Sequence, residues 1–161
     1  TSQRTPRTAS EVASVSKKVR DNGEKTGHAW KMTTTGFPTL RTTDMEATTT
    51  LLVTLGFTER LTVRDDEDPS LILHAEYALG DTGGIMVGSV RHDGSALDSV
   101  GGASIYVVVA TEREVDRLYR EIMELGHAIV RPVATQPHGG REFDFRDHDG
   151  NSWGVGSYRG A

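Results

Sequence analysis

An imidazole and a carboxylate stand two residues apart in the sequence, at His74 and Glu76. On a β-strand the alternation of side chains would place both groups on the same face. Such a pair can act as a general base and its partner, or can supply two ligands to a metal ion. Two groups are too few to hold a metal by themselves. A hydrogen-bonded pair on a pocket wall or at a rim is therefore the alternative interpretation.

The other five histidines fall where solvated side chains are expected. They lie in the N-terminal segment, in a linker, after a helix and in two turns, at His28, His92, His127, His138 and His148. The chain contains no cysteine, which excludes thiol nucleophiles and disulfide bonds. His74 is thus the histidine to which the sequence assigns a chemical role.

Composition narrows the class of protein. A chain of 161 residues with 35% hydrophobic content is expected to form one domain with its own core. No apolar run is long enough to span a bilayer, and none follows the N-terminal arginines, so a cytoplasmic protein is predicted. The net charge of -5, with both signs interspersed, argues against nucleic-acid binding and weakly favours cationic ligands.

The elements that position His74 and Glu76 begin at Gly36. Asp44 is a good N-cap for a helix that Gly56 ends. Apolar alternation predicts four strands around this helix, at residues 36–42, 57–63, 71–79 and 85–90. The order is one strand, one helix and three strands.

The second half of the chain repeats this order. A strand at 104–109 precedes a helix at 112–125, and strands at 128–133 and 142–146 and one ending near Tyr158 follow. Residues 1–31 are polar and form a predicted extension, with a thin helical pattern at 11–19. We expect a folded domain at 32–161, with repeats at about 36–91 and 103–159.

Short matches support a true internal repeat. Residues 76–81 match 142–147, the Leu-Gly pair at 55–56 matches 125–126, and the Gly-Ser pair at 88–89 matches 156–157. A repeated unit of this size usually cannot close its own core and pairs with another copy. Two βαβββ repeats in an α+β fold are therefore predicted.

At this point the sequence resembles the superfamily of glyoxalases, bleomycin resistance proteins and extradiol dioxygenases, also called the vicinal oxygen chelate superfamily. The likeness is clearest to its bleomycin-resistance-like branch and covers about residues 36–159. The second half carries it at 115–119, 129–132, 136–137, 141–143 and 146–153. The first half matches more loosely, at 40–41, Asp44, 55–57 and 74–76.

The resemblance implies a curled mixed sheet that forms a cup, with the helices on the outside and a ligand inside. It also implies a homodimer that shares or exchanges halves. In metal-dependent members, His and Glu side chains on the first and last strand of each unit hold a divalent ion. The ion chelates neighbouring substrate oxygens.

Alignment of the two repeats places Phe37, Met86, Ala103 and Gly154 at those four positions. Phenylalanine, alanine and glycine offer no side-chain donor, and a methionine thioether is a soft, weak ligand for hard cations. Neighbouring residues such as Pro38 are no better as metal ligands. The sequence therefore predicts no metal and no cofactor.

Strand alternation suggests which side chains line the cup. Phe37 and Thr39 share one face, as do His74 and Glu76, and Met86 is an adaptable filler. This mixture suits a mostly apolar ligand site with a few orienting polar groups. The alternative is that Phe37 only fills the empty metal position and does not contact a ligand.

Trp153 could stack on a flat, cationic ligand. However, it points to the opposite side of its strand from Gly154. Packing of Trp153 in the core is the equally weighted alternative.

The leading hypothesis is a small-molecule binder that sequesters an antibiotic-like compound without catalysis, as the resemblance implies. The alternative is a lyase, isomerase or thiol-transfer enzyme that uses a displaced metal or His74 and Glu76. A third possibility is a regulatory or scaffold domain whose N-terminal extension contacts a partner.

Overall fold

The computed structural model describes residues 36–137 and 139–160. The predicted extension at 1–31, its helical pattern, His28 and His138 lie outside these residues. The first unit consists of β1 (Thr39–Thr42), α2 (Met45–Thr54), β2 (Thr58–Arg64), β3 (Ile72–Leu79) and β4 (Gly83–Ser89). The second consists of β5 (Ser104–Val108), α3 (Glu112–Glu124), β6 (Ala128–Thr135), β7 (Arg141–Arg146) and β8 (Ser152–Gly156).

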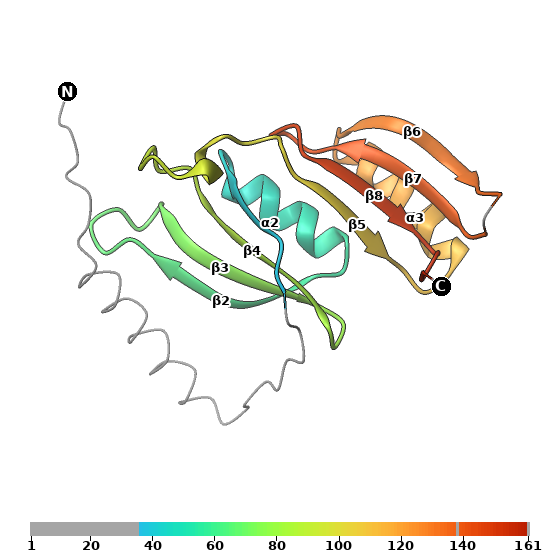
Figure 1. The fold of residues 1–161 in the computed structure, drawn as a ribbon, viewed down its shortest axis with the longest axis horizontal. Helices are drawn as coiled ribbons and strands as arrows, with labels where there is room; N and C mark the ends of the chain where they lie inside the picture. Colours follow the sequence, from blue (N-terminus) through green and yellow to red (C-terminus); the bar gives the residue numbers. More distant parts are fainter. Residues whose placement is uncertain (1–35, 138, 161) are drawn as a thin grey trace. The chain divides into compact units, whose positions relative to one another are not determined.

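Each unit forms a four-stranded mixed sheet with the same topology. The strand orders are β1-β4-β3-β2, which we call sheet A, and β5-β8-β7-β6, which we call sheet B. The first and last strands of each unit pair in parallel, and the other pairs are antiparallel. Figure 1 shows α2 with sheet A and α3 behind sheet B. The predicted α+β fold of two βαβββ repeats is confirmed.

Both helices begin and end as their capping residues predict. The Asp44 side chain accepts a hydrogen bond from the backbone N–H of Ala47 at 3.0 Å and so caps α2. After each helix the chain turns at a glycine in the left-handed region, Gly56 at φ 94° and Gly126 at φ 81°. None of the helices in the described ranges is long and apolar enough to cross a membrane.

One hydrophobic core joins the two units on the helix sides of the sheets. It includes Leu52 of α2 and Ile122 of α3, both fully buried, and the helices contact each other. Three of its aromatic side chains come from sheet B, where Phe145 lies between Phe143 and Trp153. The opposite faces of the two sheets, which we call the cup faces, therefore carry the side chains available to a ligand.

The hydrogen-bonded ladders correct the predicted alignment of β3 with β7. Glu76 pairs with Met86, whereas Asp144 pairs with Gly154. With Met86 equivalent to Gly154, Glu76 corresponds to Asp144, and His74 corresponds to Glu142. The sequence match between residues 76–81 and 142–147 is thus displaced by two residues. A two-residue slip keeps every side chain on its own face, so the apolar pattern cannot reveal it.

The alignment of the first strands is corrected by one residue. Thr39 pairs with Met86 and Tyr106 pairs with Gly154. The equivalent of Phe37 is therefore Ser104 and not Ala103. A one-residue shift exchanges the two faces of a strand, which is why Ala103 packs against the core while Ser104 is exposed.

Candidate ligand-binding faces

The cup face of sheet A brings together five of the predicted ligand-binding residues. Thr39, Met86 and Glu76 stand side by side across β1, β4 and β3. The Phe37 ring lies over Gly84. A Cβ added at Gly84 would come within 2.5 Å of the ring, so the ring leaves no room for a side chain there. The predicted grouping on one face is found, and its role in binding stays a prediction.

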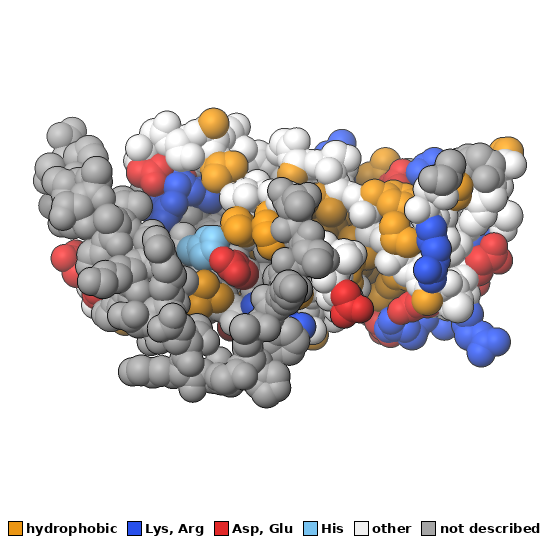
Figure 2. Space-filling model, turned by 60° about the horizontal axis from the view of Figure 1, so that its bottom comes forward, with side chains coloured by type: hydrophobic (Ala, Val, Ile, Leu, Met, Phe, Trp, Pro, Cys, Tyr) orange, Lys and Arg blue, Asp and Glu red, His pale blue; other side chains and the backbone are white. Residues whose placement is uncertain are grey.

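His74 completes this set through a direct contact with Glu76. The Nε2 atom of His74 lies 2.9 Å from Oε1 of Glu76, and the two side chains are 36% and 33% exposed. An accessible imidazole–carboxylate pair at this distance has the geometry of a general base and its partner. On the face that Figure 2 shows, histidine, acidic and hydrophobic side chains lie close together.

Tyr106 dominates the cup face of sheet B. Its ring covers Gly154 and Gly156 of β8, and an added Cβ at Gly154 would come within 2.7 Å of Cδ2 of the ring. The Tyr106 hydroxyl donates a hydrogen bond to Oε2 of Glu142 at 3.1 Å. Burial and this carboxylate raise the pKa of Tyr106 to about 12, so the phenol stays protonated at neutral pH. The residue nevertheless remains 44% exposed.

Glu142 and Asp144 form an acidic pair beside Tyr106. Arg131 of β6 donates to Glu142 at 2.8 Å and to Asp144 at 2.7 Å. The Glu142 side chain is only 9% exposed, whereas that of Asp144 is 31% exposed. We call Tyr106, Arg131, Glu142 and Asp144 the sheet B cluster. Sequence reasoning missed it, although the spacing of Glu142 and Asp144 on one strand is a signal for two carboxylates on one face.

Arg41 shares the cup face of sheet A by strand alternation but is not available to a ligand. Its guanidinium makes two hydrogen bonds to Asp93, at 2.8 and 2.9 Å, and also contacts Asp98. Both carboxylates belong to the segment that links the two units. The Arg41 side chain is 5% exposed, so this pairing fastens the linker onto sheet A.

Replacing Arg41 with alanine should lower the free energy of unfolding by about 2–3 kcal/mol, because two carboxylates lose a buried, bidentate partner. The hydrogen bonds from Arg41 hold the pKa of Asp93 well below its usual range. This contribution is therefore present at neutral pH and is lost as the pH falls below the ordinary carboxyl range. Urea denaturation at pH 7 and pH 3 measures both effects, and an equal loss at the two pH values would contradict the pairing.

Trp153 is not a ligand platform. Its side chain is 1% exposed and stacks on Phe145, with ring centroids 6.2 Å apart. The indole N–H donates to Oδ2 of Asp147 at 2.9 Å. With no free ring face, Trp153 cannot stack on a ligand, and the predicted binding role is wrong. The strand alternation that opposed Trp153 to Gly154 gave the correct side.

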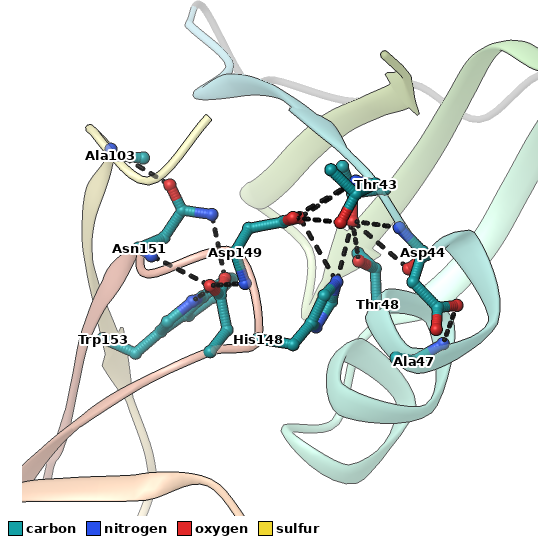
Figure 3. A network of polar contacts seen from close by, with 11 residues as sticks. Thr43, Asp44, Ala47, Thr48, Ala103, His148, Asp149, Asn151 and Trp153 are labelled. Carbon is teal, nitrogen blue, oxygen red and sulfur yellow. Dashed lines mark hydrogen bonds and ion pairs between the residues drawn. The ribbon is translucent and has the colours of Figure 1, made fainter. Parts of the chain in front are cut away.

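The turn before β8 ties the second unit to the first. Nε2 of His148 lies 3.0 Å from Oγ1 of Thr42, and the Asp149 carboxylate accepts hydrogen bonds from the backbone and hydroxyl of Thr43. Figure 3 shows both side chains reaching toward the start of α2. His148, predicted to be a solvated turn residue, thus also contributes to the junction between the units.

Comparison with known proteins identifies the family of this chain. A family model for the Glyoxalase/Bleomycin resistance protein/Dioxygenase superfamily matches residues 31–155. The chain belongs to this superfamily. No curated protein sequence matches it.

Several solved structures share its fold. TioX from Micromonospora sp. ML1 is 25% identical, with a TM-score of 0.57 over 78% of this chain and 97% of that one. A glyoxalase-related enzyme from Fulvimarina pelagi is 23% identical, with a TM-score of 0.58 over 78% and 88%. Lactoylglutathione lyase from Agrobacterium tumefaciens is 18% identical, with a TM-score of 0.55 over 78% and 94%.

The residues at the superfamily's metal positions do not fit a divalent ion. With the alignment corrected by the strand pairings, the positions that the resemblance assigns to the metal ligands are Phe37, Met86, Ser104 and Gly154. They offer one thioether and one hydroxyl, where a hard cation needs carboxylates or imidazoles. Elsewhere in the described ranges, no three His, Asp or Glu side chains come together as a metal site.

Proposed function

We propose that this protein binds a small, antibiotic-like molecule in the cup without a metal. It would protect the cell by sequestering that molecule. The observation that carries this is the replacement of the superfamily's metal-ligand positions by Phe37, Met86, Ser104 and Gly154, with the rings of Phe37 and Tyr106 over neighbouring glycines. Aromatic rings in these places supply contact area for a ligand in place of a Lewis acid.

The charges on the cup faces favour a flat, cationic ligand. Glu76, Glu142 and Asp144 are acidic, and Arg131 is shared between two of these carboxylates. The exposed ring of Tyr106 lies beside the carboxylates, so a cation stacked on it would gain both cation–π and ionic attraction. Binding of this kind should weaken as salt is added.

We also propose that the protein is a homodimer. Tyr106 and Val108 on β5 are 44% and 43% exposed on the cup face of sheet B. A second copy would bury them and enclose the ligand between facing sheets. Sedimentation analysis of the full chain tests this.

A location in the cytoplasm remains a prediction from composition.

The proposal is tested on one purified sample of the full chain. Metal analysis comes first, followed by a melting-temperature screen against divalent cations and flat cationic antibiotics. Sequestration predicts metal-free protein that is stabilised by an organic cation, which mass spectrometry then recovers intact. Stabilisation by a metal, or recovery of a chemically altered compound, would overturn the proposal.

The alternative function is an enzyme of the same superfamily. The 2.9 Å contact between His74 and Glu76 favours it, because this pair can act as base and partner in a lyase, isomerase or thiol-transfer reaction. Replacing His74 with alanine should then reduce turnover at least 100-fold while leaving the melting temperature within about 2 °C, since both side chains are accessible. Unchanged turnover would exclude His74 as the base.

A further inference from the structure

A polar groove lies on the helix side of sheet A, on the opposite face from the cup. Its volume is about 390 Å³, within the range of small-molecule sites. It is lined by residues of α2 and of the edge strand β2, and by Tyr77 of β3. The groove is therefore separate from the cup and independent of the function proposed for it.

The internal repeat explains why the groove exists. In the second unit, Tyr119 of α3 packs edge-on against Phe143 of β7, with ring centroids 5.3 Å apart. Alignment of the two helices at their C-caps, Leu55 and Leu125, places Thr49 at the position of Tyr119. The strand pairings of β3 with β4 and of β7 with β8 place Ala75 at the position of Phe143. Two aromatic rings that fill the second unit are thus absent from the first.

The polar lining is not required by the fold. Tyr77 corresponds to Phe145, and Glu59 corresponds to Ile129. The second unit thus fills these positions with apolar side chains that pack against its core. The first unit instead has a phenol and a carboxylate. These two polar groups line the groove and hydrogen-bond to each other.

Hydroxyl groups line the middle of the groove. The Tyr77 hydroxyl, on a side chain 2% exposed, lies 3.0 Å from Oγ1 of Thr49 and donates to Glu59 at 3.3 Å. Oγ1 of Thr62 is buried without a hydrogen-bond partner among the described residues. A buried hydroxyl without a partner is costly, and a ligand's polar group would satisfy it.

Charged side chains of both signs line the groove: Glu46 on α2, and Glu59 and Arg64 on β2. Glu59 and Arg64 both line it, from either end of β2. Two irregularities in the pairing of β2 with β3 change the register between them, one after Glu59 and one before Arg64. At about 3.3 Å per residue, their Cα atoms are on the order of 15 Å apart, a span that the two side chains shorten. A ligand that contacts both Glu59 and Arg64 must carry a positive and a negative group that are well separated.

We propose that this groove binds a short zwitterionic peptide, with its ammonium group toward Glu59 and its carboxylate toward Arg64. The amide groups of the peptide hydrogen-bond to the hydroxyls of Thr49, Thr62 and Tyr77. A dipeptide or tripeptide has the required length and hydrogen-bonding groups, whereas the ammonium and carboxylate of a single α-amino acid are too close together.

The test is isothermal titration of the full chain with an equimolar pool of unblocked dipeptides and tripeptides. The control is the same pool with acetylated N-termini and amidated C-termini. Saturable binding of the unblocked pool, with at least tenfold weaker binding of the blocked pool, is expected. Equal binding of both pools, or no binding of the unblocked pool at millimolar concentration, would overturn the proposal.

Thr49→Tyr is the decisive variant, because it installs the aromatic residue that the second unit uses at this position. It should abolish peptide binding without lowering the melting temperature. Glu59→Gln and Arg64→Gln should each weaken binding about tenfold or more. Tyr106→Ala, on the cup face, should leave peptide binding unchanged. Peptide binding that survives Thr49→Tyr in a folded variant would place the peptide elsewhere and contradict the assignment.

Discussion

Replacing Trp153 with alanine is expected to lower the free energy of unfolding by about 3–5 kcal/mol. The indole is 1% exposed and fills the core beside Phe145, so its removal leaves a large cavity. The Asp147 carboxylate also loses one of its donors. Urea denaturation followed by circular dichroism measures the loss.

The matched control is Val130→Ala on β6, where the side chain is 59% exposed and the expected change is within about 0.5 kcal/mol. A Trp153→Ala protein with near-normal stability but impaired ligand binding would restore the stacking role that the structure excludes. The conservative variant Trp153→Phe should recover part of the stability, because it refills most of the cavity but cannot donate to Asp147.

Replacing Glu142 with glutamine should weaken binding of a flat cationic ligand by about 10- to 100-fold, provided that the cup is the binding site. Glu142 is the most enclosed carboxylate of the sheet B cluster and holds both Tyr106 and Arg131 in place. The substitution keeps the shape of the side chain and removes its charge. Titration of the wild type and the variant with the antibiotic found in the screen measures the effect.

A neutral analogue of that antibiotic provides the internal control, because its affinity should change less than threefold. Glu124→Gln, at an exposed position of α3, provides the matched protein control. If both compounds lose affinity equally, Glu142 acts by shaping the site and not by its charge. If neither loses affinity, the ligand does not contact the sheet B cluster.

Local sequence features predicted the two helices and most of the strands. Asp44 caps α2 as expected, and Gly56 and Gly126 follow the helix ends, because capping and left-handed turns depend on a few neighbouring residues. The repeat of one helix and four strands was also readable from apolar periodicity. The family resemblance then gave the superfamily, which the family model confirms.

The site was predicted only in part. Strand alternation correctly grouped Phe37 with Thr39 and His74 with Glu76, because it needs only the parity of positions along a strand. It could not show that Arg41 is sequestered by the linker carboxylates, since those lie more than fifty residues away. The sheet B cluster was missed for the same reason, because its members come from three strands that only the folded sheet brings together.

The sequence alone determined most of the secondary structure and the internal repeat, since each depends on residue type and short-range spacing. The tertiary structure decided the register of the repeats and the burial of Trp153. It also opened a groove where Thr49 and Ala75 replace the aromatic pair Tyr119 and Phe143. A two-residue slip preserves every sequence pattern, so only the hydrogen bonds between strands and the packing of side chains distinguish the alternatives.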